Sequence, residues 1–220
     1  GKSLAEVAER MARRFDLSRI KEHAIELDPR MVDATMARDL ASIGVTRASL
    51  GVQDLNPHVQ LAIGRLQPFE TVATAVNALR DAGIKAINLD LMYGLPEQSE
   101  GDLRKSIALA LTLAPNRFAL FGYAHVPWFK VHQRLIPENA LPGAEARLVQ
   151  ARAAHEAFTA AGYVAIGLDH FARADDPLAM AAREGRLTRN FQGYTDDEAD
   201  ALIGLGASSI GRLPQGFVQN

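Results

Sequence analysis

The chain has 220 residues, a formal net charge of −2 and no cysteine. This length is enough for one large domain with a real core, and the near-neutral charge does not point to nucleic acid or a membrane surface as a partner. No apolar run reaches the roughly 18 residues that a membrane-spanning helix needs. The lack of cysteine excludes disulfides and thiolate metal ligands within these residues. We therefore expect a cytoplasmic monomer that binds neither nucleic acid nor membranes and holds no metal through its own side chains.

Several segments carry apolar residues at helical spacing, beginning with an amphipathic N-terminal stretch that does not have the pattern of a signal peptide. The predicted helices cover residues 3–15, 32–43, 69–82, 100–113 and 144–161, with short helices starting at Asn56-Pro57 and over 178–184. Short apolar runs bounded by glycine or proline predict strands between them. The predicted strands cover residues 23–27, 48–53, 84–91, 118–123 and 163–169, with a small-residue strand over 202–210.

Strand and helix alternate at least five times, and each repeat has the size of a βαβ unit. This predicts an α/β fold with a parallel sheet and right-handed crossovers. Polar residues recur late in successive strands: Glu26, Gln53, Asp90, and Asp169 or His170. An open doubly wound sheet is the rival architecture, but this recurrence favours a barrel, whose strands all point their ends at one central site.

The strand that ends in LDLMYGLP carries the clearest chemical signal. Ile87, Leu89 and Leu91 share one face of this strand, whereas Asn88 and Asp90 share the other. A helix-covered parallel strand is expected to be apolar on both faces, so two polar groups on one face indicate a site. The strand alone fits equally well a buried Asp90 that is satisfied by backbone amides.

The loops after the strands are rich in aromatic and basic residues. Pro127-Trp128-Phe129 predicts either a packing plug or a contact with a large flat apolar ligand. His125 follows one strand, and the arginines of the later loops, with Arg134, fit either a solvated surface or a site for a carboxylate-rich substrate. The glycine-rich GLGAS lacks the dinucleotide fingerprint, so close backbone packing is its favoured interpretation.

An ordered set of motifs resembles the oxygen-independent coproporphyrinogen III oxidases, which are radical S-adenosylmethionine (SAM) enzymes. The motifs are IELDP (25–29), LGVQD (50–54), INLDLMYGLPEQ (87–98), FGYAHVPW (121–128), GLDHFARADDPLAMAAREG (167–185) and RNFQGYT (189–195). The first ones belong to a wider group that includes haem-chaperone relatives, whereas the last two point to the oxidase proper.

The resemblance implies a partial (β/α)6 radical-SAM-type barrel with parallel strands. The family's CxxxCxxC and GGGTP segments are absent from this chain. Our interpretation is that residues 1–220 form a single truncated barrel domain that lacks the first strands and the C-terminal helical domain.

The resemblance also assigns binding roles to individual positions. Those that would contact SAM are Glu26, Gln53, Arg65, Asp90 and, through its backbone, Ala124. Those that would contact a second SAM, or the substrate that replaces it, are Gln192 and Ile210. Those expected to hold the substrate carboxylates are Arg173, Arg183 and Arg189. The resemblance leaves the catalytic residue unassigned.

The implied reaction is the conversion of two propionates of coproporphyrinogen III into vinyl groups, which yields protoporphyrinogen IX in haem biosynthesis. A reduced [4Fe-4S] cluster, with ligands outside this chain, would cleave SAM to a 5′-deoxyadenosyl radical that abstracts hydrogen from the propionate. Loss of carbon dioxide and one electron would complete each conversion, and an electron donor would reduce the cluster.

Three alternatives remain open at this stage. The first is a haem-binding chaperone of the same fold, against which RNFQGYT argues. The second is a cluster-independent barrel lyase that uses Asp90 and Glu26 as acid and base. The third, for the 220 residues alone, is an inert fragment that is unstable in isolation because its sheet edges are exposed.

Overall fold

One six-stranded sheet organises the fold, which a computed structural model describes for residues 2–220. The strand order in this sheet is β1-β2-β3-β4-β6-β5. Its strands are Ala24–Leu27 (β1), Arg47–Gln53 (β2), Ala86–Tyr93 (β3), Arg117–Gly122 (β4), Tyr163–Ile166 (β5) and His170–Arg173 (β6). The first four strands are parallel neighbours in chain order, which confirms the predicted βαβ alternation.

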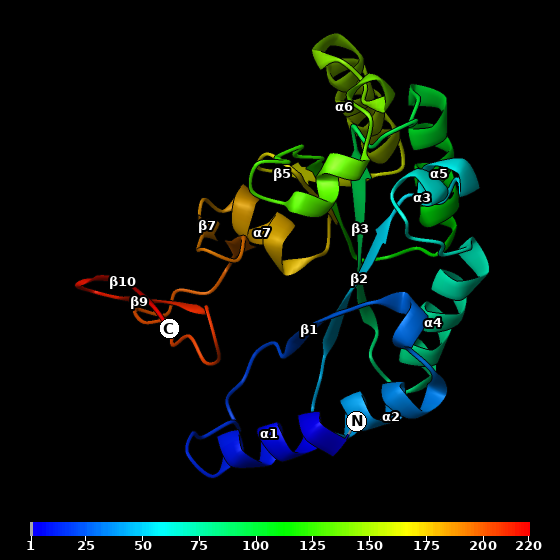
Figure 1. Ribbon diagram of the computed structural model, residues 1–220. Coiled ribbons are helices and arrows are strands. Elements are labelled where there is room, and N and C mark those ends of the chain that lie inside the picture. The colour runs from blue at the N-terminus through cyan, green and yellow to red at the C-terminus, as the bar shows by residue number, and fades with distance from the viewer. Residues whose placement is uncertain (1) are drawn as a thin grey trace.

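Helices connect the parallel strands, and most of them cover one face of the sheet. They are Lys2–Ala12 (α1), Ala34–Ser42 (α2), Pro57–Ala62 (α3), Phe69–Asp81 (α4), Glu100–Thr112 (α5), Ala144–Ala160 (α6) and Pro177–Arg183 (α7), with 3-10 turns at Pro29–Met31, Val131–Leu135 and Glu138–Ala140. Figure 1 shows α2, α4 and α5 along one side of the strands and the C-terminal hairpin on the other. Among residues 2–220, none of the helices is both long and apolar enough to cross a bilayer.

The local sequence explains where these helices begin. Ser99 starts α5 with a capping box, because its hydroxyl accepts from the backbone of Asp102 while the Asp102 carboxylate accepts from the backbone of Ser99. Asp33 caps α2 in the same way through the backbone amide of Met36. A proline fills the first turn of α3, where an amide would have no partner.

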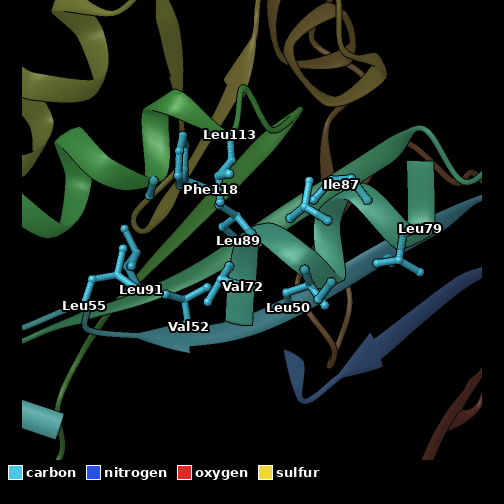
Figure 2. Packing of buried hydrophobic residues seen from close by; sticks show 14 of the residues in the cluster. Leu50, Val52, Leu55, Val72, Leu79, Ile87, Leu89, Leu91, Leu113 and Phe118 are labelled. Atoms are coloured by element: carbon cyan, nitrogen blue, oxygen red, sulfur yellow. The ribbon is translucent and has the colours of Figure 1, made fainter. Parts of the chain in front are cut away.

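The hydrophobic core lies between the sheet and this helix layer. Alternation places Leu50 and Leu89 on the covered face, where both are fully buried beside Val72 and Leu79 of α4 (Figure 2). Phe118 extends the core toward α6, where its ring lies 4.5 Å from that of Phe158. Because this face is apolar from β2 to β4, the polar residues of the same strands all lie on the opposite, inner face.

The predicted strand over 163–169 is instead a tight hairpin. β5 ends at Ile166, and Gly167 turns the chain with a φ of +62°, a conformation that favours glycine. β6 then inserts between β4 and β5 and runs antiparallel to both. The prediction of an entirely parallel sheet is therefore wrong at this edge, and the sheet is mostly parallel.

The predicted strand over 202–210 is also wrong. Only an isolated bridge joins Leu202 to Arg212, and the strands that form are a separate antiparallel hairpin, Ile210–Leu213 (β9) with Gly216–Gln219 (β10). A Cβ on Gly204 would lie 3.0 Å from the backbone nitrogen of Gly211, so this glycine serves close backbone packing, as GLGAS predicted. Before this hairpin, the chain forms a shorter one from Thr188–Arg189 (β7) and Tyr194–Thr195 (β8).

Candidate active site

The inner face of the sheet holds a small polar pocket that extends from Arg117, the first residue of β4, to Asp90 and Phe121 further along the strands. β1, β2 and β3 deliver Glu26, Ser49 and Asp90 to it. Its volume is about 220 Å³, and its other lining residues are Asn88, Arg117, Phe118, Ala119, Phe121, His170 and Gln192. The prediction that Glu26 and Asp90 face a common inner site is confirmed.

Asp90 is the most perturbed acid of this pocket. Its burial, and the negative charge of Glu26, raise its pKa to about 6, against the opposing effect of the Ser49 hydroxyl. That hydroxyl lies 3.0 Å from both carboxylate oxygens and is the hydrogen-bond donor to Asp90 within residues 2–220. The alternative of an acid satisfied by backbone amides is therefore wrong, and Asp90 keeps acceptor capacity for a ligand.

Gln53 and Arg65 lie close together beside Gly51 of β2. β2 carries an irregularity between Gly51 and Gln53, and Gln53 has a left-handed backbone with a φ of +67°. Nη2 of Arg65 donates to the carbonyl of Gly51 at 2.9 Å and lies 3.4 Å from the carboxylate of Asp28. A Cβ on Gly51 would lie 3.0 Å from Nε2 of Gln53, so glycine here lets the Gln53 side chain pack closely against β2.

This second group has an unmet donor. Nε of Arg65 is buried and has no hydrogen-bond partner among the described residues. Buried polar atoms in native proteins normally have partners, so this donor fits a polar ligand that accepts from it. Asp28 beside it is firmly ionised, because hydrogen bonds from Arg30 and the charge of Arg65 lower its pKa to about 2.

β6 runs antiparallel to β4 and brings His170 to the pocket. Because of this direction, its first residue pairs with Ala119 in the middle of β4, beside the pocket. The Nδ1 atom of His170 lies 2.7 Å from the carboxylate of Asp169. Gln192, about twenty residues later in the chain, lines the same pocket. The structure therefore gathers Glu26, Asp90, His170 and Gln192 around one pocket, while their predicted roles in binding stay predictions.

The three arginines expected at the substrate do not gather. Arg173 ends β6 at the other edge of the sheet, where its backbone amide donates to Asn116 ahead of β4 and its side chain reaches Asp175, so it does not line this pocket and its role with the substrate stays a prediction. Arg183 is exposed at the end of α7. Arg189 alone lies near the site, with its guanidinium 5.2 Å from the ring of Tyr194.

Two further predicted contacts lie outside the pocket. Ala124 is exposed just after β4, and its carbonyl accepts from Nε2 of Gln133 at 3.0 Å. Gln133 also accepts from the amide of Val126, so this buried side chain fixes the loop that carries Ala124. Ile210 starts β9 in the C-terminal hairpin and is not a lining residue of the pocket. Trp128 in the aromatic loop is 75% exposed, which excludes the packing plug.

Sequence reasoning missed a buried ionic network on the inner face, which adjoins the pocket because Asn88 and Arg117 also line it. Nε of Arg117 lies 2.8 Å from the Asp176 carboxylate, while Arg47 reaches Glu22 at 2.7 Å and the side-chain oxygen of Asn88 at 3.0 Å. Arg47 and Arg117 are only 5% and 8% exposed. The signal was available, because each arginine lies two residues before an inward residue of its strand, Ser49 or Ala119.

The described residues do not bring three metal-ligating side chains together. The donor set of the pocket is instead one of carboxylates, amides, a hydroxyl and an imidazole. Carboxylates accept hydrogen bonds from ammonium groups and sugar hydroxyls, while Arg65 offers a free N–H. The arrangement therefore suits an organic ligand with both donor and acceptor groups.

Comparison with known proteins identifies the fold family. The chain is 52% identical to an oxygen-independent coproporphyrinogen III oxidase of Bradyrhizobium diazoefficiens, over 99% of this chain and 48% of that protein. The Radical SAM superfamily profile matches residues 2–110. The chain belongs to the radical SAM superfamily.

Two other similar proteins agree. An oxidase of the same name from Paracoccus denitrificans is 50% identical over 94% of this chain and 46% of its own length. The structure of coproporphyrinogen III oxidase from Escherichia coli, a radical SAM enzyme, superposes with a TM-score of 0.95 and 36% identity, over 99% of this chain and 50% of that one. The chain spans about half the length of the curated relatives it matches.

Proposed function

We propose that this chain supplies the SAM-binding and substrate-facing pocket of an enzyme that decarboxylates two propionates of coproporphyrinogen III to vinyl groups, giving protoporphyrinogen IX. The observation that carries the proposal is the polar pocket on the inner face of a sheet that matches an oxidase of this class over 99% of the chain. The carboxylates of Glu26 and Asp90, the amide of Gln53 and the guanidinium of Arg65 lie along that one side of the sheet, so one ligand can contact them together.

The residues on this side of the sheet fit SAM. Glu26 and Asp90 offer carboxylate acceptors for an ammonium group or ribose hydroxyls. Arg65 offers its unpartnered Nε to a carboxylate, and Gln53 lies beside it. When bound, SAM with a reduced [4Fe-4S] cluster supplies one-electron hydrogen abstraction. Because the chain holds no cysteine, the cluster ligands would come from outside these 220 residues.

The chain's own residues would bind, orient and shield. Asp90 is held in place by Ser49, so its acceptor oxygens are fixed before a ligand arrives. Trp128 and Phe129, both largely exposed after β4, form an apolar surface that a tetrapyrrole ring can cover. Such coverage would keep water from the reacting carbon. We also propose that a separate electron donor reduces the cluster and that the protein is a monomer.

The test uses the protein at the length of its curated relatives, reconstituted anaerobically with iron, sulfide and reductant. SAM and coproporphyrinogen III are added, and 5′-deoxyadenosine and protoporphyrinogen IX are quantified. We expect both products, and a loss of at least about 100-fold in Asp90→Asn and Gln192→Ala. Asp81→Asn, which changes an exposed acid at the end of α4, is the matched control and should keep wild-type rates.

The other outcomes separate the alternatives. SAM cleavage without a porphyrin product would support the radical chemistry but indicate a different substrate. Absence of cleavage, together with stable haem binding, would contradict the oxidase and support a haem carrier. Carboxylate-dependent turnover without a cluster would support the acid/base lyase.

A further inference from the structure

We propose that His170, held by Asp169, binds the carboxylate of the propionate that is being converted. This inference rests on the proposed function and names the residue that recognises the reacting group. It goes beyond the arginines that the sequence suggested, of which Arg173 lies at the wrong edge of the sheet.

The position of His170 suits a ligand contact. Its Nδ1 atom is taken by the Asp169 carboxylate at 2.7 Å, which leaves Nε2 as the nitrogen available to a ligand. Its side chain is 22% exposed, so it is neither sealed in the core nor free in solvent. The rings of Phe121 and Tyr194 contact it edge-on at 5.9 and 5.5 Å, and these contacts restrict the orientation of the imidazole.

The pocket has two chemically different sides. Glu26, Ser49 and Asp90 stand on β1 to β3 and present mainly acceptors. β4 and β6 supply Arg117 and His170, which are donors. A ligand carboxylate is repelled by the first side and attracted by the second, so it belongs next to β6.

Of the donors on β4 and β6, His170 is the one that a ligand can use, alongside the amide of Gln192 from the loop that follows. Nε of Arg117 is committed to the buried Asp176 at 2.8 Å, and its guanidinium is only 9% exposed. A carboxylate at Nε2 of His170 would place the imidazole between two carboxylates, where both ring nitrogens donate. Such charge-assisted hydrogen bonds change affinity by about 10- to 100-fold. Asp169 is then a positioning residue, because it acts through the imidazole.

The experiment measures binding rather than turnover. Coproporphyrin III and mesoporphyrin IX are titrated onto the full-length protein and followed by fluorescence. Mesoporphyrin IX carries ethyl groups where coproporphyrin III carries the two propionates that react. We expect His170→Gln to weaken coproporphyrin III by about 10-fold or more, with the affinities for mesoporphyrin IX and SAM unchanged. Asp169→Asn should weaken coproporphyrin III in the same direction but less.

His155→Gln is the matched control. The His155 ring lies 5.7 Å from that of Phe171 on β6, so it touches the same strand from the helix side, away from the pocket. Equal losses for both porphyrins, or the same loss in His155→Gln, would assign His170 a structural role and overturn the inference. Unchanged affinity for coproporphyrin III in both His170→Gln and Asp169→Asn would overturn it too.

Failure of this inference is distinguishable from failure of the proposed function. A wild-type protein that makes protoporphyrinogen IX while His170→Gln keeps its affinity contradicts only the role of His170. A wild-type protein that neither binds coproporphyrin III nor makes product contradicts both.

Discussion

The two ends of the inner sheet face carry buried charges in opposite ways. Where the strands start, Arg47 and Arg117 are paired with Glu22 and Asp176. Two residues further along β3 than Asn88, Asp90 has a hydroxyl partner but no cation among residues 2–220, and burial raises its pKa to about 6. The paired end holds α7 against the sheet, whereas the unpaired end leaves capacity for a ligand. Whether a buried charge has a partner therefore separates structure from site on this face.

The variant with the largest expected change in stability removes the negative charge of Asp176 from the paired end. In Asp176→Asn the amide can still cap α7, as the carboxylate does through the amide of Leu178, but buried Arg117 loses its ion-pair partner at 2.8 Å and buried Arg47 loses one of its two. We expect the free energy of unfolding to fall by about 3 to 5 kcal/mol, measured by urea denaturation at pH 7.

The control for that variant is Asp33→Asn. Asp33 caps α2 through the amide of Met36 but is exposed and lacks an ion-pair partner among the described residues. Its loss should stay within about 0.5 kcal/mol. Equal losses in the two variants would mean that Asp176 acts as a cap and that the buried arginines are satisfied without it.

Asp90→Asn should change stability in the opposite direction. Since the pKa of Asp90 is raised from 3.8 to about 6, the folded protein binds more protons than the unfolded chain between these pH values. Stability is therefore lost as pH rises from about 4 to about 6. The neutral amide avoids this loss, so the variant should be more stable at pH 7, on the order of 2 to 3 kcal/mol, and equal to wild type near pH 4.

The measurement is a pair of urea denaturation curves at these two pH values, with SAM absent. A variant that is destabilised at pH 7 would show that Asp90 is a structural acid with a compensating cation, and the contrast between the two ends would fail. The expected gain in stability comes with the loss of activity proposed above, as is common where a site is strained for function.

The smallest effect is expected for Ser49→Ala. Ser49 donates to both oxygens of Asp90 and so favours the charged carboxylate. Its removal should raise the pKa of Asp90 further, measured by carboxyl-carbon NMR titration, and cost about 1 kcal/mol at pH 7. Ser42→Ala, an exposed hydroxyl on α2, should leave the pKa of Asp90 unchanged. An unshifted pKa in Ser49→Ala would mean that other groups hold the carboxylate.

Local patterns predicted the parts of this fold that depend on local chemistry. The alternation of Ile87, Leu89 and Leu91 with Asn88 and Asp90 gave the correct faces of β3, because a strand reverses its side chains at every residue. Glycine and proline marked the ends of the helices for the same local reason. The inward position of the pocket carboxylates followed directly from this periodicity.

Only the tertiary structure decided which distant residues meet. The sequence does not reveal that β6 turns back between β4 and β5, and this reversal brings His170 to the pocket while it carries Arg173 away. It does not pair Arg117 with Asp176, 59 residues later. Periodicity fixes how a side chain faces its own neighbours, whereas pairing across long loops depends on the packing of the whole domain. The sequence by itself therefore determined the faces and the family resemblance, and the fold decided which charges are paired and which remain open to a ligand.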